Sequence, residues 1–300
     1  MLTPREIIAQ AWTVTTTEPS LKRWGFAGSA LRLLLDIKLV GYQFYFAYAY
    51  MAGKEVGLFD DGIWLYENAP LSVFWIILIA FAVLVVTELF LPIFCDGAII
   101  GLTAKSHNKE RVSGGFILGM YNFFPIFAVH QIFVFSGINL LVTAISILLR
   151  YGSGLTGFMI VIATILWLFS SILSFLASFA EPAIVINKIG VFEAIGHSVK
   201  LTFSYPGHII FLILLLLIIS FRIAVNIAIL ILIPGLVIGL GIVLTYVLTP
   251  TISYTIAGAI ALALTLVAAY FFMYLHVFKQ AVWTIMYMEL TKEKDLDKIG

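Results

Sequence analysis

The sequence contains a long apolar run over residues 71–94, in which Glu88 is the one ionisable side chain. Similar apolar runs recur along the 300 residues. A helix of about 18 or more apolar residues can cross the roughly 30 Å hydrocarbon core of a bilayer, at about 1.5 Å per residue. A water-soluble domain of this length has too little interior to bury so much apolar surface. The chain is therefore predicted to be all-α, a polytopic bundle of membrane-spanning helices.

The apolar pattern predicts about six spans, arranged as three hairpins. They cover residues 30–51, 71–95, 125–149, 155–179, 208–233 and 256–278, and the last span is open to continuation as helix to Glu289. The segment 234–250 is apolar but carries glycines between two prolines. It is either a re-entrant hairpin covered by protein or an extension of the fifth helix kinked at Pro234.

Lysine and arginine are unevenly distributed between the two sides of the predicted bundle. With six spans both termini share one side, and that side holds 12 of the 17 basic residues, whereas the opposite loops hold Lys54 and Arg150. Because short cytoplasmic loops carry an excess of lysine and arginine, both termini are predicted to be cytoplasmic. The net charge of +1 provides no basic surface to neutralise phosphates, so nucleic acid is not expected as a partner.

Two segments far apart in the chain are similar to one another without gaps. Residues 5–19 match residues 192–206, with Glu6 opposite Glu193 and Pro19 opposite Pro206, and a fainter copy lies over residues 112–125. The ends of two spans also correspond. Phe94-Cys-Asp-Gly-Ala-Ile-Ile is similar to Phe179-Ala-Glu-Pro-Ala-Ile-Val.

These similarities predict one integral membrane domain of three repeat units. The units cover residues 1–111, 112–190 and 191–290, followed by a short cytoplasmic tail over 291–300. Each unit is expected to be an amphipathic helix followed by a transmembrane hairpin. Amphipathic helices of this kind lie in the plane of the headgroups with the apolar face toward the lipid.

The segment that follows the fourth span resembles a known family. It reads Phe179-Ala-Glu-Pro-Ala-Ile-Val-Ile-Asn-Lys-Ile-Gly-Val-Phe-Glu-Ala-Ile-Gly-His-Ser-Val-Lys-Leu-Thr, a span end, a short loop and an amphipathic helix with Glu-Ala-Ile-x-x-Ser. With Ala11-Trp12 and Trp24-Gly25-Phe26, it is similar to prokaryotic six-helix membrane proteins. That group includes the YciC-like proteins and the membrane domain fused to some glycerophosphodiester phosphodiesterases. The resemblance implies a six-helix fold in a prokaryotic cytoplasmic membrane, and it supplies no catalytic residues to transfer.

Four ionisable residues in or at the ends of spans are candidate site residues. Glu88 lies in the second span, Arg222 in the fifth, and Asp96 and Glu181 at the cytoplasmic ends of the second and fourth. A charge at mid-helix costs about 2.5 to 3.5 kcal/mol on insertion scales, so such residues mark functional positions and have partners. Glu88 and Arg222 are expected either to line a polar path from the cytoplasm or to form a structural ion pair. Alternatively, Arg222 contacts lipid headgroups or a partner subunit.

Three charged residues at the start of the first span have a structural interpretation. Arg32 and Asp36 are four residues apart, so they share a helix face and are expected to neutralise one another. Lys38 is expected to extend its side chain toward the cytoplasmic interface.

Histidine provides the one cofactor hypothesis. His130 in the third span and His276 in the sixth lie at depths that suit axial ligation of a b-type haem. The simpler interpretation is hydrogen bonding between helices, and no cofactor is expected. The single cysteine, Cys95, is taken to exclude an internal disulfide and a thiolate metal site, and the chain has no His-Glu-x-x-His motif. Neither a metal site nor a catalytic residue is predicted.

The sequence therefore favours a non-enzymatic multi-pass membrane protein, a subunit or scaffold of a membrane complex. Its expected partners are membrane lipids and other membrane proteins. The first alternative is a small-molecule or lipid transporter with a polar path near Glu88 and Arg222. The second alternative is a haem-binding membrane subunit.

Overall fold

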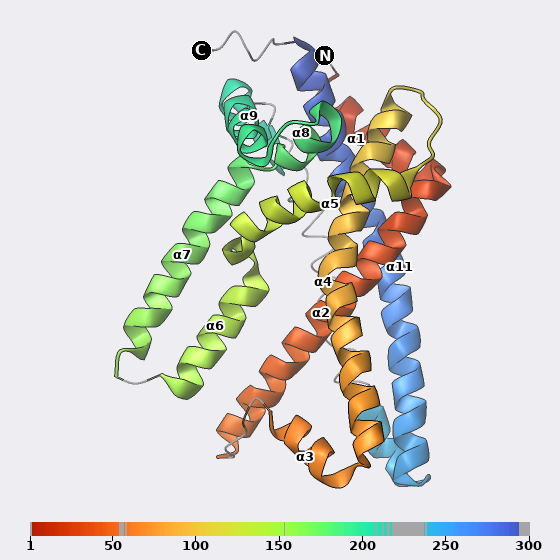
Figure 1. Cartoon of the computed structure of the whole chain (residues 1–300), viewed down its shortest axis with the longest axis vertical. Helices are drawn as coiled ribbons and strands as arrows, with labels where there is room; N and C mark the ends of the chain where they lie inside the picture. Colours follow the sequence, from red (N-terminus) through yellow and green to blue (C-terminus); the bar gives the residue numbers. More distant parts are fainter. Residues whose placement is uncertain are drawn as a thin grey trace.

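The computed structural model describes residues 2–53, 57, 59–152, 154–207, 209–211, 213, 214, 217, 237 and 239–293. These residues form helices and loops, with no strand among them (Figure 1). The helices are α1 (Pro4–Thr17), α2 (Pro19–Met51), α3 (Asp60–Asn68), α4 (Leu71–His107), α5 (Gly115–Ile132), α6 (Ile138–Tyr151), α7 (Thr156–Leu176), α8 (Ala180–Asn187), α9 (Val191–Ser204) and α11 (Pro250–Glu293), with a 3₁₀ turn η1 (Val134–Ser136).

Four helical stretches in the described part of the chain are long and apolar enough to cross a membrane. They are Leu71–His107, Gly115–Ile132, Thr156–Asn187 and Pro250–Lys292. By length and composition, the chain is therefore a membrane protein. The predicted first span lies within α2, and most of the predicted fifth span lies outside the described residues. Of the segment 234–250, residues 234–236 and 238 also lie outside them.

The prediction of one continuous helix for the third span, residues 125–149, is wrong. Helix α5 ends at Ile132, and Gly137 adopts an extended conformation before α6 begins. The carbonyl group of Ser136, at this break, accepts a hydrogen bond from the indole nitrogen of Trp167 at 3.1 Å. Because a side chain from α7 satisfies the exposed backbone, the chain can interrupt the helix there.

Two helices extend well beyond the thickness of a bilayer. Helix α4 has 37 residues and α11 has 44, which correspond to about 55 and 66 Å of helix. The predicted continuation of the last span to Glu289 is confirmed. One end of both helices therefore stands outside the hydrocarbon, and in Figure 1 it is at the top, where α1, α8 and α9 gather around it.

This end forms a conventional protein core, which we call the packed end. It comprises α1, residues 92–107 of α4, α8, α9 and residues 277–290 of α11. Ile7, Leu201 and Tyr287 come from three different helices, Phe179 directly precedes α8, and all four side chains are fully buried there. The expectation that α1 lies on the lipid headgroups with its apolar face down is wrong, because Ile7 belongs to this core and α1 packs against α11.

The two ends of the described chain contact one another at the packed end. The backbone nitrogen of Leu2 donates a hydrogen bond to the carboxylate of Glu289 at 3.1 Å. Thr3 and Glu6 then form a capping box, in which each side chain accepts a hydrogen bond from the other residue's backbone nitrogen. The backbone nitrogen and the hydroxyl group of Thr3 both donate to the Glu6 carboxylate and hold its pKa below its ordinary value. The two ends of the described chain therefore lie on one side of the molecule.

A second part of the molecule, which we call the membrane region, is packed much more thinly. It comprises residues 33–51 of α2, residues 71–91 of α4, α6, α7 and residues 250–276 of α11. No residue of α6 or α7, all of which the structure describes, is buried. Apolar side chains such as Ile76, Phe158 and Phe169 face outward. This surface suits contact with lipid chains rather than water.

Candidate functional site

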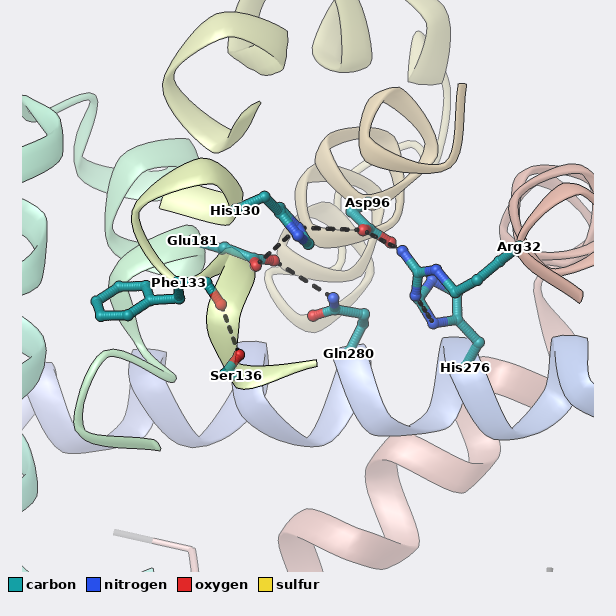
Figure 2. A network of polar contacts seen from close by, with 8 residues as sticks. All are labelled: Arg32, Asp96, His130, Phe133, Ser136, Glu181, His276 and Gln280. Carbon is teal, nitrogen blue, oxygen red and sulfur yellow. Dashed lines mark hydrogen bonds and ion pairs between the residues drawn. The ribbon is translucent and has the colours of Figure 1, made fainter. Parts of the chain in front are cut away.

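The candidate site is built around the carboxylate of Asp96, where the packed end meets the membrane region. The Asp96 side chain is only 1% exposed. Nη2 of Arg32, from α2, lies 3.0 Å from Oδ2 of Asp96, and Nε2 of His276, from α11, lies 2.7 Å from Oδ1 (Figure 2). A buried carboxylate requires such partners, because burial without them costs several kcal/mol.

A second carboxylate joins this one through a histidine. Nε2 of His130, on α5, lies 3.2 Å from Oε1 of Glu181 on α8 and 3.7 Å from Oδ2 of Asp96. The side-chain nitrogen of Gln280, on α11, donates to Oε2 of Glu181 at 3.4 Å. Figure 2 shows the His130 ring between the two carboxylates. Five helices thus contribute to one group of contacts, which we call the polar cluster: Arg32, Asp96, His130, Glu181, His276 and Gln280.

The polar cluster contains more negative than permanent positive charge. Asp96 and Glu181 contribute two carboxylates, and Arg32 contributes one guanidinium. The two imidazoles can each be neutral or protonated, so the net charge of the cluster changes with the protons that they hold. Chemically, the arrangement can take up a proton or a cation beside His130 and can release it again.

The structure brings together four of the residues singled out in the sequence. Asp96 and Glu181 both contact His130, and His276 contacts Asp96. Both histidine Nε2 atoms are directed at the Asp96 carboxylate. Axial ligation of a haem requires the two rings to face a common iron instead, so the haem hypothesis stays a prediction that this arrangement does not favour.

The remaining two sequence candidates do not belong to the polar cluster. Glu88 forms an ion pair with Lys38 of α2, and Arg222 lies outside the described residues. The expectation that Lys38 extends to the cytoplasmic interface is therefore wrong, because the buried Glu88 carboxylate holds the Lys38 ammonium group. An unpaired Glu88 carboxylate would carry the cost of a buried charge.

The expected pairing of Arg32 with Asp36 is also replaced by contacts between helices. Arg32 turns to Asp96 on α4, whereas Asp36 accepts a hydrogen bond from the side-chain amide of Asn139 on α6. Burial favours these contacts, since the fully buried Asp96 carboxylate gains more from a positive partner than the partly buried Asp36 carboxylate does.

Polar contacts continue along α2 from the cluster into the membrane region. After Arg32 come the Asp36–Asn139 hydrogen bond, the Lys38–Glu88 ion pair and a hydrogen bond of 3.3 Å from Gln43 to Thr143. From Arg32 to Gln43 the helix rises by about 16 Å. A shallow depression of about 350 Å³ lies beside this row and is lined by Lys38, Gly41, Tyr42 and Tyr45. We call these contacts the polar row.

Sequence reasoning did not select Arg32 or Gln280 for the site, although a signal for Gln280 was present. Phe278-x-Gln280 repeats the spacing of Phe94-x-Asp96 and Phe179-x-Glu181. The three polar residues of this pattern all belong to the polar cluster. Each of the three polar residues lies on a helix that packs against another helix of the packed end or beside it. Helix α5 packs on α4, α9 on α8 and α1 on α11. The division into three units stays a prediction, and these correspondences support it.

No family model, curated protein or solved structure matches the chain. The resemblance to the YciC-like proteins accordingly stays a prediction.

Proposed function

We propose that the protein is a membrane transport protein in which the polar cluster takes up and releases a proton or another cation. The observation that carries this proposal is the buried Asp96 carboxylate, which contacts Arg32 and His276 and reaches Glu181 through His130. Ionisable groups on membrane helices are costly and recur in proton relays and ion pathways.

The polar row supports transport over a scaffold role. Its hydrogen bonds and its ion pair lie on α2 in the membrane region, where the surrounding side chains are apolar. Polar side chains that follow one helix face through an apolar region provide a path with a lower electrostatic barrier than lipid. The depression beside Lys38 lies on that same path.

Flux in proteoliposomes tests the proposal. The protein is reconstituted with a pH-sensitive dye inside, and a potassium gradient with valinomycin sets the membrane potential. We expect the dye to report proton movement faster than in protein-free liposomes, and Asp96→Asn to abolish the difference. Glu193→Gln changes an exposed carboxylate on α9 and serves as the matched control. Flux equal to that of protein-free liposomes, or unchanged in Asp96→Asn, contradicts the proposal.

A subunit or scaffold role is the second candidate, and the α6–α7 hairpin favours it. None of its described side chains is buried, whereas a membrane helix in a closed bundle normally buries one face. Ile147, Phe158, Leu166 and Phe169 are all exposed there. If another subunit covers this face, purification in a mild detergent yields a stoichiometric partner, and replacing Phe158 and Leu166 with bulky tryptophans releases it.

We place the protein in the cytoplasmic membrane of a prokaryote with both ends at the cytoplasmic side. The support is the excess of lysine and arginine on one side of the predicted bundle, together with the contact of Leu2 with Glu289. A protease added to inside-out vesicles should remove a tag from either end. Protection of both tags contradicts this orientation.

A further inference from the structure

We propose that Asp96, His130 and Glu181 bind a divalent first-row transition-metal ion of the Mn²⁺, Fe²⁺, Co²⁺ or Zn²⁺ class. Binding of the ion goes beyond the proposed function, whereas its role as the transported cation rests on that function. The three side chains come from α4, α5 and α8, which the fold brings together where the packed end begins.

The geometry of the three residues suits one ion. Each offers one ligand atom, and these atoms all lie within 4.8 Å of one another. Nε2 of His130 is 3.2 Å from the Glu181 oxygen and 3.7 Å from the Asp96 oxygen. Two ligand atoms about 2.1 Å from a tetrahedral ion are about 3.4 Å apart. The two distances from His130 differ from this value by only a few tenths of an ångström, and rotation of the two carboxylates adjusts the separation of their oxygens, which lies within 4.8 Å.

The His130 nitrogen lies between the two carboxylates without a well-directed hydrogen bond to either of them. Nε2 of His130 forms an ion pair with Glu181 at 3.2 Å, but neither carboxylate oxygen has the direction of a regular hydrogen bond to it. A nitrogen lone pair and two carboxylate oxygens repel one another unless a positive charge lies between them. A divalent ion would satisfy all three atoms at once, and a proton on His130 is the competing explanation.

Contacts beyond the three ligands orient them toward a common point. His276 lies on Oδ1 of Asp96 at 2.7 Å, and Gln280 donates to Oε2 of Glu181 at 3.4 Å. Each bond holds the oxygen that is farther from His130, so Oδ2 and Oε1 are left for an ion. Arg32 also donates to Oδ2 at 3.0 Å, and this oxygen retains a second lone pair. Hydrogen bonds of this kind fix the orientation of metal-ligating carboxylates.

The ligand set selects the class of ion. Imidazole combined with carboxylate suits first-row divalent metals, whereas Mg²⁺ and Ca²⁺ prefer oxygen ligands alone. Copper(I) prefers thiolate and thioether ligands, and none of the three residues supplies sulfur. Arg32 offsets one negative charge, which leaves a net charge of about one positive unit with the ion bound and both histidines neutral.

Cobalt titration of the full chain in detergent, after removal of metals with a chelator, tests the site. We expect visible d–d absorption bands that saturate at one Co²⁺ per chain and that Zn²⁺ abolishes by competition. Mg²⁺ at the same concentration should leave the bands unchanged. His130→Gln should weaken binding at least about tenfold, whereas His197→Gln, the same change on α9, should leave it unchanged.

A second ligand variant covers the case in which His130→Gln does not fold. Glu181→Gln keeps the size of the side chain and should also weaken Co²⁺ binding at least about tenfold, with an unchanged elution volume in size-exclusion chromatography. The inference is overturned if the unmodified protein shows no saturable bands. It is also overturned if both ligand variants bind Co²⁺ as tightly as the unmodified protein does. Proton flux without Co²⁺ binding overturns the metal site alone, and Co²⁺ binding without flux of either cation overturns the proposed function alone.

Discussion

The packed end and the membrane region solve the problem of apolar surface in two different ways. Phe179 at the packed end is fully buried, with its ring against Trp283, whereas Phe169 in α7 is 61% exposed. In the first case other side chains remove the ring from water, and in the second case lipid is expected to do so. Close packing of side chains therefore specifies the structure of the packed end, while contact with lipid stabilises the membrane region.

The polar cluster lies where these two regimes meet. Asp96 lies at the start of the buried part of α4, which begins at Pro92 and follows the exposed apolar part of the helix. In the membrane region few neighbouring side chains can form hydrogen bonds with a polar group. At the packed end a polar group takes the place of an apolar side chain in a close-packed core. The boundary is where a protein can hold charges away from water and still supply partners for them, which is what an ion site requires.

The largest expected effect compares the same substitution in the two regions. Phe179→Ala should lower the free energy of unfolding by about 3 to 5 kcal/mol, because it leaves a cavity among buried side chains. Phe169→Ala should change it by less than about 1 kcal/mol, because detergent or lipid fills the space. Denaturant unfolding of both variants in one detergent measures the difference, and equal losses would remove the distinction between the regions.

Removal of the central carboxylate tests the boundary itself. Asp96→Ala should cost about 3 kcal/mol, because it leaves Arg32 without its partner close to a buried site. The exposed fraction of the Arg32 side chain, 41%, keeps the effect at the lower end of the range for buried pairs. The double variant Arg32→Met with Asp96→Ala should recover part of the loss in the same unfolding measurement. No recovery would show that Asp96 does not act through Arg32.

A close approach between helices makes the packed end sensitive to a single methyl group. A Cβ atom on Gly119 of α5 would lie 2.7 Å from the backbone oxygen of Phe94 on α4. Gly119→Ala must therefore separate the two helices and should cost about 1 to 3 kcal/mol. Gly196→Ala on α9 places its methyl group in open space and should stabilise the protein by about 0.5 to 1 kcal/mol. The midpoints of thermal unfolding of the two variants should shift in opposite directions from that of the unmodified protein.

The smallest effect concerns the start of α1. Thr3→Ala removes one half of the capping box and should cost about 1 kcal/mol, whereas Thr3→Ser keeps the hydroxyl and should be neutral. The Glu6 carboxylate, whose pKa is lowered in the folded state, contributes stability above its unfolded pKa that is lost as the pH falls through the folded pKa. The difference between Thr3→Ala and the unmodified protein should therefore shrink in acid. Hydrogen exchange at the amide nitrogens of α1 measures both effects.

Much of the helix content was predictable because apolar periodicity is a local property. The start of α4 and both ends of α7 were expected within a few residues, and so was the continuation of α11 to Glu289, whereas α4 continues well past its predicted end at Cys95 to His107. The break at Gly137 was not expected. The sequence there stays apolar. At the break, the indole nitrogen of Trp167, a residue of another helix, donates a hydrogen bond to the Ser136 carbonyl group.

The sequence by itself determined that the chain spans a membrane and that Glu88, Asp96, Glu181, His130 and His276 need explanation, because the cost of a polar group in hydrocarbon does not depend on the fold. Only the tertiary structure decided their partners. It paired Glu88 with Lys38, placed His130 between Asp96 and Glu181, and turned Arg32 away from Asp36. A charge chooses its partner by distance and burial, and both arise when helices distant in sequence pack together.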